Sequence, residues 1–120
     1  MTEKTINILG KDVRMKYCAA TETGFEKLTG KSISDISFAT QEDTITLAIS
    51  AIVAAYARNN EEPPISSDDL LYDAKPADII ELAKTVIELR AEWYGIPKVV
   101  ADELEKEADE IDDSEKEKNA

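Results

Sequence analysis

The sequence predicts an α+β fold in which an N-terminal β-hairpin packs on a mainly α-helical body of four to five helices. Two short stretches near the N-terminus alternate apolar and polar residues, and two longer stretches repeat apolar residues at steps of three and four. Alternation is typical of a half-buried strand, and the longer step is typical of an amphipathic helix. At 120 residues, 42% of them hydrophobic, the chain has the size of one ordinary domain. We therefore expect a single domain over residues 1–111 and a disordered acidic tail over residues 112–120.

The predicted hairpin joins strands at residues 5–9 and 13–17. Gly10 and Lys11 lie between them, and glycine accepts the positive φ of a tight II′ turn, although the loop could equally include Asp12. An isolated two-stranded ribbon is marginally stable in water, so its apolar face must lie on the helices. That face consists of Ile6, Ile8, Val13, Met15 and Tyr17.

A short helix is expected after the hairpin. Residues 23–26 have the form of a capping box, and the two alanines before Thr21 allow an earlier start near that residue. The helix is expected to end at Gly30, which accepts the left-handed conformation of a helix stop, with Lys31 near the free carbonyls.

The same stretch, residues 25–32, resembles a phosphate-binding loop at first sight. That loop requires four residues between its first glycine and the Gly-Lys-Ser end, whereas five residues separate Gly24 from Gly30. These five residues favour a helix over an open phosphate cradle. We therefore interpret the stretch as a helix end, with Phe25 and Leu28 turned inward against the hairpin, and expect no cofactor.

The longest apolar pattern predicts a helix from Gln41 to about Arg58. Thr40 and Asp43 have capping spacing, and residues 48–57 carry no charge, which indicates a largely buried helix. Its predicted buried positions are Ile45, Ala48, Ile49, Ile52, Val53 and Tyr56. The connection before it contains three apolar residues expected to tuck under the helices, namely Ile33, Ile36 and Phe38.

Proline and glycine divide the rest of the chain. Two prolines end the loop at residues 59–64, Ser66 or Ser67 caps a single turn at residues 68–72, and Pro76 opens a helix that runs to Tyr94. Gly95 ends that helix. Its predicted apolar stripe contains Ile79, Ile80, Ala83, Val86, Ile87, Arg90, Trp93 and Tyr94. A last, fraying helix is expected over Val99, Val100, Leu104, Ala108 and Ile111.

The net charge of −12 is concentrated at the C-terminus, because residues 101–120 contain ten acidic and three basic side chains. Nucleic acid is not an expected partner, since affinity for phosphates needs clustered Lys and Arg. No apolar run approaches the length that crosses a bilayer, and the N-terminus has no secretory signal pattern. These features predict a cytoplasmic protein with no membrane partner.

The residue types needed for most catalysis are missing or isolated. The chain has no histidine, and its single cysteine, Cys18, has the apolar setting of a small buried hydrophobe. Asp68, Asp69 and Asp73 form the densest acidic group near the expected core, and a magnesium site there is the alternative to their expected role at a helix start. The sequence predicts no enzyme, no catalytic residue and no metal site.

Trp93 and Tyr94 stand just before a helix stop. Such aromatic residues can anchor a partner because they combine a large area with a polar edge. Trp93 continues the apolar stripe and is expected in the core. The candidate partner-binding residues are therefore Tyr94, Ile96, Val99, Val100 and Leu104.

Residues 13–17 (Val-Arg-Met-Lys-Tyr) and 25–32 (Phe-Glu-Lys-Leu-Thr-Gly-Lys-Ser), followed by an Ala- and Ile-rich helix and a proline-containing loop, form an order that resembles the small tail assembly chaperones of long-tailed bacteriophages and gene-transfer-agent-like elements. The resemblance implies a non-catalytic protein of the bacterial host cytoplasm. It implies the tape measure protein as partner, with tail-tube subunits as a further one. Self-association stays open. The alternative is an acidic inhibitor that mimics nucleic acid and binds a basic partner.

Overall fold

The computed structural model describes residues 2–95, and this part of the chain has the predicted fold class, a β-hairpin packed on four α-helices. In chain order the elements are β1 (Glu3–Ile8), β2 (Lys11–Lys16), α1 (Ala19–Thr29), the 3₁₀ helix η1 (Ile33–Asp35), α2 (Gln41–Ala57), α3 (Ser67–Tyr72) and α4 (Pro76–Tyr94). The helix and the acidic tail expected after Gly95 lie outside the described residues.

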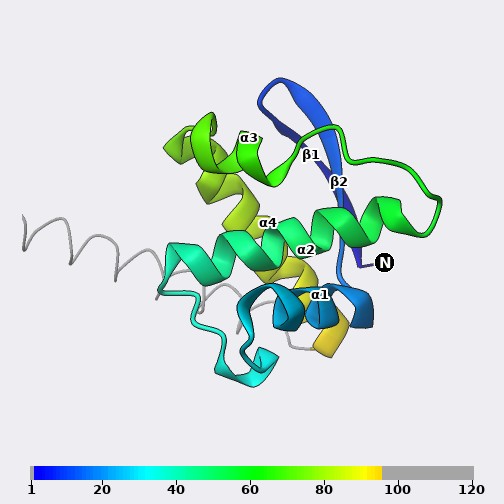
Figure 1. The fold of residues 1–120 in the computed structure, drawn as a ribbon, viewed down its shortest axis with the longest axis vertical. Helices are drawn as coiled ribbons and strands as arrows, with labels where there is room; N and C mark the ends of the chain where they lie inside the picture. The colour runs from blue at the N-terminus through cyan, green and yellow to red at the C-terminus, as the bar shows by residue number, and fades with distance from the viewer. Residues whose placement is uncertain (1, 96–120) are drawn as a thin grey trace, which may run out of the picture.

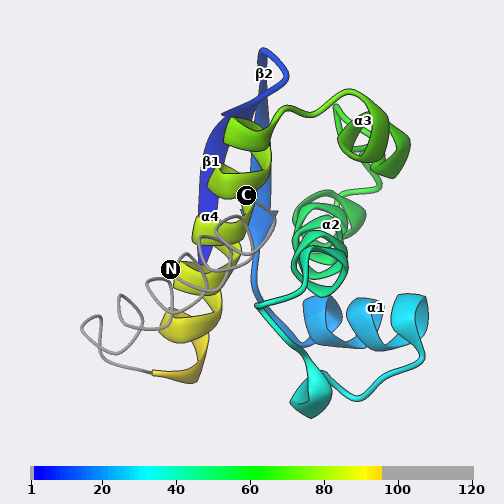
Figure 2. The same cartoon turned by 90° about the vertical axis from the view of Figure 1, so that its left-hand side faces the viewer.

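Helix α2 occupies the middle of the molecule. Figure 1 shows α1 and α3 beside it and the hairpin and α4 behind it, and in Figure 2 the hairpin and α4 lie together to its left. Strand β2 packs mainly against α2, whereas β1 contacts α4, so the two long helices cover the apolar side of the hairpin together. Burial of this surface is the main favourable contribution to folding.

The hairpin has the expected apolar face, and all five of its predicted side chains are buried. Its turn differs from the prediction. Ile8 pairs with Lys11, so the loop is Leu9-Gly10, and both residues have positive φ, 55° and 75°. Two successive positive φ values belong to a type I′ turn, whose twist matches that of the strands. Leu9 takes this position because its side chain packs against the core.

The predicted helix boundaries are largely confirmed. Gly30 and Gly95 end α1 and α4 with φ of 72° and 73°, and Pro76 is the first residue of α4. Ser66 caps α3, and Thr40 precedes α2. These positions follow from local backbone chemistry, which the sequence carries directly.

Helix α1 begins earlier than the capping-box pattern at residues 23–26 indicated. Cys18 is its N-cap and is half-buried rather than buried. The Thr21 hydroxyl accepts a hydrogen bond from the Cys18 N–H at 3.2 Å and donates one to the Lys16 carbonyl at 2.7 Å. Thr23 instead lies within the helix and donates to the Ala19 carbonyl.

Four predictions of burial were wrong. Leu28 is 64% exposed, Val53 49%, Ile80 50% and Trp93 39%, and Ile49 is only partly buried. The prediction for Leu28 was wrong because α1 packs mainly on α2 and contacts the hairpin through its first turn. The other misplaced residues lie on helices that are apolar over a wide arc, so their spacing does not say which side the neighbours cover. The apolar side chains of the 32–39 connection do pack against the core.

Candidate partner-binding surface

Two aromatic side chains are exposed at the C-terminal end of α4. Trp93 is 39% and Tyr94 47% exposed, beside the first turn of α1. Of the predicted partner-binding residues, the structure describes Tyr94, and it is accessible as expected. The other four, Ile96, Val99, Val100 and Leu104, lie outside the described residues. We call the exposed rings of Trp93 and Tyr94, together with the partly buried Glu22, Phe38 and Arg90 and the buried Tyr17 that they contact, the aromatic end of α4.

One carboxylate ties this surface together. Glu22, in the first turn of α1, accepts a hydrogen bond from the Tyr17 hydroxyl at 2.7 Å and another from the Tyr94 hydroxyl at 2.5 Å, both on Oε2. A negative charge is favoured at a helix N-terminus, so this position suits Glu22. The two bonds join the end of β2, the start of α1 and the end of α4.

Both tyrosines are held in their neutral, donating form. Burial, followed by the hydrogen bond to Glu22, raises the pKa of Tyr17 far above its usual range. The hydrogen bond to Glu22 raises the pKa of Tyr94, with burial adding to the effect. Ionisation would place a second negative charge against Glu22, so the arrangement resists it.

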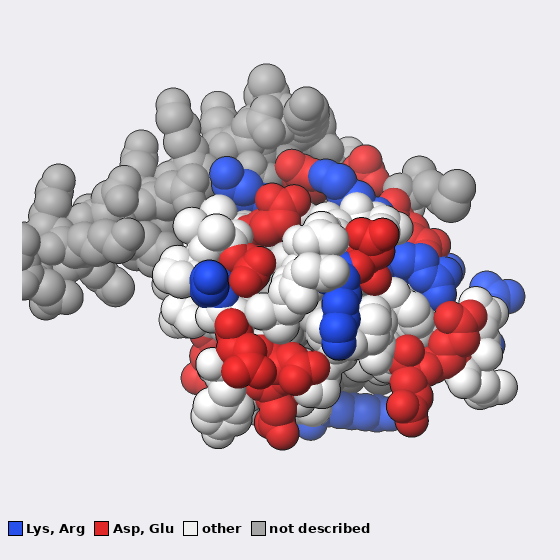
Figure 3. Space-filling model, turned by 90° about the horizontal axis from the view of Figure 1, so that it is seen from above, with Lys and Arg blue, Asp and Glu red and all other residues white. Residues whose placement is uncertain are grey.

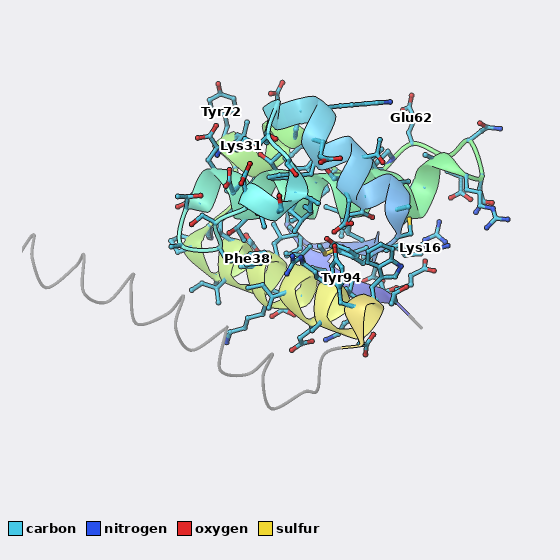
Figure 4. The ribbon with its side chains drawn as sticks, turned by 90° about the horizontal axis from the view of Figure 1, so that it is seen from below. Lys16, Lys31, Phe38, Glu62, Tyr72 and Tyr94 are labelled. Carbon is cyan, nitrogen blue, oxygen red and sulfur yellow. The ribbon has the colours of Figure 1, made fainter. Side chains whose placement is uncertain are left out.

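The rings of the surface pack on one another. The Trp93 ring lies 5.4 Å from that of Tyr17 and 5.0 Å from that of Tyr94, the latter nearly edge to face at 78°. The Arg90 guanidinium lies 4.9 Å from the Tyr94 ring centre and 5.4 Å from that of Phe38. Figure 4 shows Tyr94 at the end of α4 and Phe38 reaching the same helix from the loop before α2. Such contacts fix the rings before any partner arrives.

This arrangement is suited to recognition. Trp, Tyr and Arg supply most of the energy at protein interfaces, and rings that are already held lose little freedom on binding. The Arg90 Nε atom is buried and has no hydrogen-bond partner within residues 2–95. The exposed aromatic rings of this surface can contact apolar, aromatic or cationic groups.

Sequence reasoning missed Trp93 as an exposed residue, and it also missed Leu71 and Tyr72 on α3. Tyr72 is 82% exposed, and Figure 4 shows it pointing away from the body. The signal was present in the run Leu70-Leu71-Tyr72, because neighbours on a helix point about 100° apart and a single turn can bury only one of them. Leu70 is the buried member. Within residues 2–95 nothing holds the Tyr72 hydroxyl in place, unlike that of Tyr94.

The stretch that resembles a phosphate loop is closed on itself. The Lys31 ammonium lies 3.0 Å from Asp43 Oδ1, rather than near the free carbonyls of α1, and the Ser37 N–H donates to Asp43 Oδ2 at 3.0 Å. Burial alone would raise the pKa of Asp43, but the bonds from Ser37 and Lys31 hold it below its usual range. Lys31 and Asp43 therefore form an ion pair, and the stretch stabilises the fold.

The acidic group at α3 is used in the same way. Asp69 accepts a hydrogen bond from the Ser66 N–H at 2.9 Å, and its own N–H bonds to the Ser66 hydroxyl at 3.2 Å. This reciprocal pair caps the helix. Within the part of the chain that the structure describes, no group of three or more His, Cys, Asp or Glu side chains could hold a metal ion.

Charge is mixed over the described surface. On the face in Figure 3, acidic side chains gather in several groups and basic side chains lie singly between them. Phosphate binding needs basic groups that act together. Among the helices of residues 2–95, none combines the length and apolar character needed to cross a bilayer.

Comparison of the chain with protein-family models, with curated proteins and with solved structures gives no match in any of the three. Functional inference therefore depends on the residues themselves.

Proposed function

We propose that the chain is a non-catalytic assembly chaperone that binds the tape measure protein, and also tail-tube subunits, while a bacteriophage tail is built. The observation that carries the proposal is the aromatic end of α4, where Trp93 and Tyr94 are exposed yet fixed by Glu22 and Arg90. The resemblance of residues 13–17 and 25–32 to tail assembly chaperones supplies the identity of the client.

The exposed aromatic pair and the high negative charge of the chain support this function. A helical client presents apolar side chains at every third or fourth position, and an exposed aromatic pair can accept them. The other candidate partner-binding residues, Ile96, Val99, Val100 and Leu104, follow Tyr94 in the sequence and lie outside the described residues. A net charge of −12 keeps a complex with an aggregation-prone client in solution.

The test is co-expression with a tape measure protein encoded beside this chain. We expect the full chain to keep the client soluble and to co-purify with it. Trp93→Ala combined with Tyr94→Ala should lower the amount of retained client at least about tenfold, the equivalent of one modest hot spot. Tyr72→Ala is the matched control, because it removes an exposed ring whose hydroxyl has no hydrogen-bond partner within residues 2–95. Failure of the unmodified chain to bind any tail component, or equal losses in both variants, would contradict the proposal.

A second candidate is an acidic inhibitor that mimics nucleic acid. The observation in its favour is the charge of residues 101–120, which carry a net of −7 out of −12. Replacing the ten acidic side chains of residues 101–120 by their amides distinguishes the two functions, whereas deletion of residues 112–120 would remove a net charge of only −2. Charge mimicry should weaken sharply and in a salt-dependent way, whereas chaperoning through the aromatic end of α4 should largely survive.

A further inference from the structure

The two outer edges of the hairpin differ in the hydrogen bonds of their backbone groups. On the outer edge of β2, the Arg14 N–H donates to the Tyr56 hydroxyl at 3.0 Å, and the Lys16 carbonyl accepts from the Thr21 hydroxyl at 2.7 Å. Tyr56 belongs to α2 and Thr21 to α1, so the helical body closes this edge. Figure 2 shows β2 on the side of the hairpin that faces α2, with β1 beyond it.

The outer edge of β1 has no such cover. Because Ile8 and Lys11 flank a two-residue turn, hydrogen-bonded pairs alternate from there along the ladder. The backbone groups of Glu3, Thr5 and Asn7 therefore point away from β2. Within residues 2–95 none of these three backbones has a hydrogen-bond partner beyond the hairpin, and Thr5 and Asn7 are exposed.

Strand β1 has only part of the usual protection of an open edge. Proteins block such edges with proline, a bulge or charged side chains, and here the one charge on the apolar side of the strand, Lys4, pairs with Glu88 of α4 at 3.4 Å. The six residue pairs of the hairpin run without a bulge, and the strand Glu-Lys-Thr-Ile-Asn-Ile contains no proline. Its one acidic and one basic residue make it locally neutral in a chain of net charge −12.

We propose that β1 pairs antiparallel with β1 of a second copy, which gives a continuous four-stranded sheet across a two-fold axis. The proposal does not depend on the chaperone function. An isologous strand pair of this kind requires only that one edge be complementary to itself.

The sequence of β1 meets that requirement in one register. Residues whose backbone N–H and C=O groups point away from β2 must lie opposite one another in the two copies. Centring the pair on Thr5 sets Thr5 opposite Thr5 of the second copy. It also sets Glu3 opposite Asn7 and Lys4 opposite Ile6, so no charge faces a like charge. Sliding by one step of two residues toward the N-terminus would oppose Lys4 to Lys4, which is unfavourable. Sliding the other way leaves Glu3 unpaired and shortens the ladder.

The first test places a proline in β1 at a position where it disrupts only the hydrogen bonds between the two copies. Thr5→Pro removes an N–H that points away from β2, so the hairpin keeps its bonds. By sedimentation of the full chain at tens of micromolar, we expect a dimer for the unmodified protein and a monomer for the variant, with unchanged circular dichroism. Thr5→Val retains the N–H and should stay dimeric. A monomeric unmodified chain, or a folded Thr5→Pro dimer, overturns the proposal.

The second test measures which residues of the two β1 strands lie opposite each other. It does not depend on the folding of the proline variant. In a Cys18→Ala background, Thr5→Cys should form a disulfide-linked dimer on mild oxidation, since opposed residues lie about 5.5 Å apart. Asn7→Cys is the matched control, because the two substituted positions would lie about 14 Å apart, four residues along the strand. Equal cross-linking of both variants, or none in either, rejects this interface.

Discussion

Two carboxylates in this molecule each accept two hydrogen bonds, yet they do different work. Asp43 is 2% exposed and binds the Lys31 ammonium and the Ser37 N–H, which ties the loop between α1 and α2 to the start of α2. Glu22 is half-buried and binds the Tyr17 and Tyr94 hydroxyls at the molecular surface. The buried carboxylate secures the fold, and the other shapes a surface that a partner can meet.

The difference follows from what surrounds each charge. Loss of Asp43 leaves the partly buried Ser37 N–H without its acceptor and frees the half-exposed Lys31 ammonium. Loss of Glu22 leaves the buried Tyr17 hydroxyl without its acceptor, whereas the exposed Tyr94 hydroxyl can turn to water. The two sites should therefore separate stability from recognition. Three measurements test whether Asp43 and Glu22 differ in this way.

The largest effect is expected from Asp43→Ala. It leaves the Ser37 N–H without its acceptor and frees Lys31, and we expect the free energy of unfolding to fall by about 3 kcal/mol, the upper range for bonds to a charged group. Urea denaturation measures it. Glu42→Ala is the control, because it removes an exposed acidic residue from the same helical turn and should cost at most about 1 kcal/mol. Equal losses would remove the distinction.

The pH dependence of Asp43 gives the next largest effect. Its folded pKa lies below the ordinary carboxyl value, so the unfolded chain binds more protons in acid. The stabilisation is complete above the ordinary pKa of about 4 and is lost as the pH falls toward the lower folded value.

The matched variant for this pH effect is Asp43→Asn. It cannot titrate at this position, so the stability difference between the unmodified protein and the variant should shrink as the pH falls from 6 to 3. Denaturation curves across that range measure the difference. A constant difference would show that the charge of Asp43 contributes nothing.

The smallest effect on stability is expected from Glu22→Ala, about 1 kcal/mol. Its effect on the surface should be plain. Loss of the hydrogen bond lowers the pKa of Tyr94 toward its ordinary value near 10, seen by ultraviolet titration against Tyr94→Phe. The emission of Trp93, the chain's single tryptophan, should change as its neighbours loosen. If stability falls as far as in Asp43→Ala, then Glu22 is a structural residue like Asp43.

The sequence alone was sufficient for the architecture of residues 2–95. The alternation in the hairpin, the helix ends at Gly30 and Gly95 and the helix start at Pro76 depend on neighbouring residues only, and each was found where expected. The start of α1 differed because a second local capping motif, formed by Cys18 and Thr21, competed with the expected one. Thr21, bonded to the Lys16 carbonyl, moved the start of α1 away from the capping pattern at Thr23.

The candidate site was only partly predictable. Tyr94 was expected to be accessible, but Trp93 was placed in the core because it continued an apolar stripe. The exposure of Trp93 depends on how far neighbouring elements cover the C-terminal end of α4, which helical spacing does not encode. Glu22 was not singled out, since its bond to Tyr94 spans 72 residues of sequence.

The contact between β1 and α4 joins two parts of the chain that are synthesised at different times. Lys4 lies 3.4 Å from Glu88, a bond that spans 84 residues. The hairpin leaves the ribosome long before the helix that covers β1, and a bare hairpin is marginally stable. Closing so long a loop is slow relative to forming local structure. Folding of this domain is therefore completed only when α4 arrives, and until then the apolar side of β1 is open to other chains.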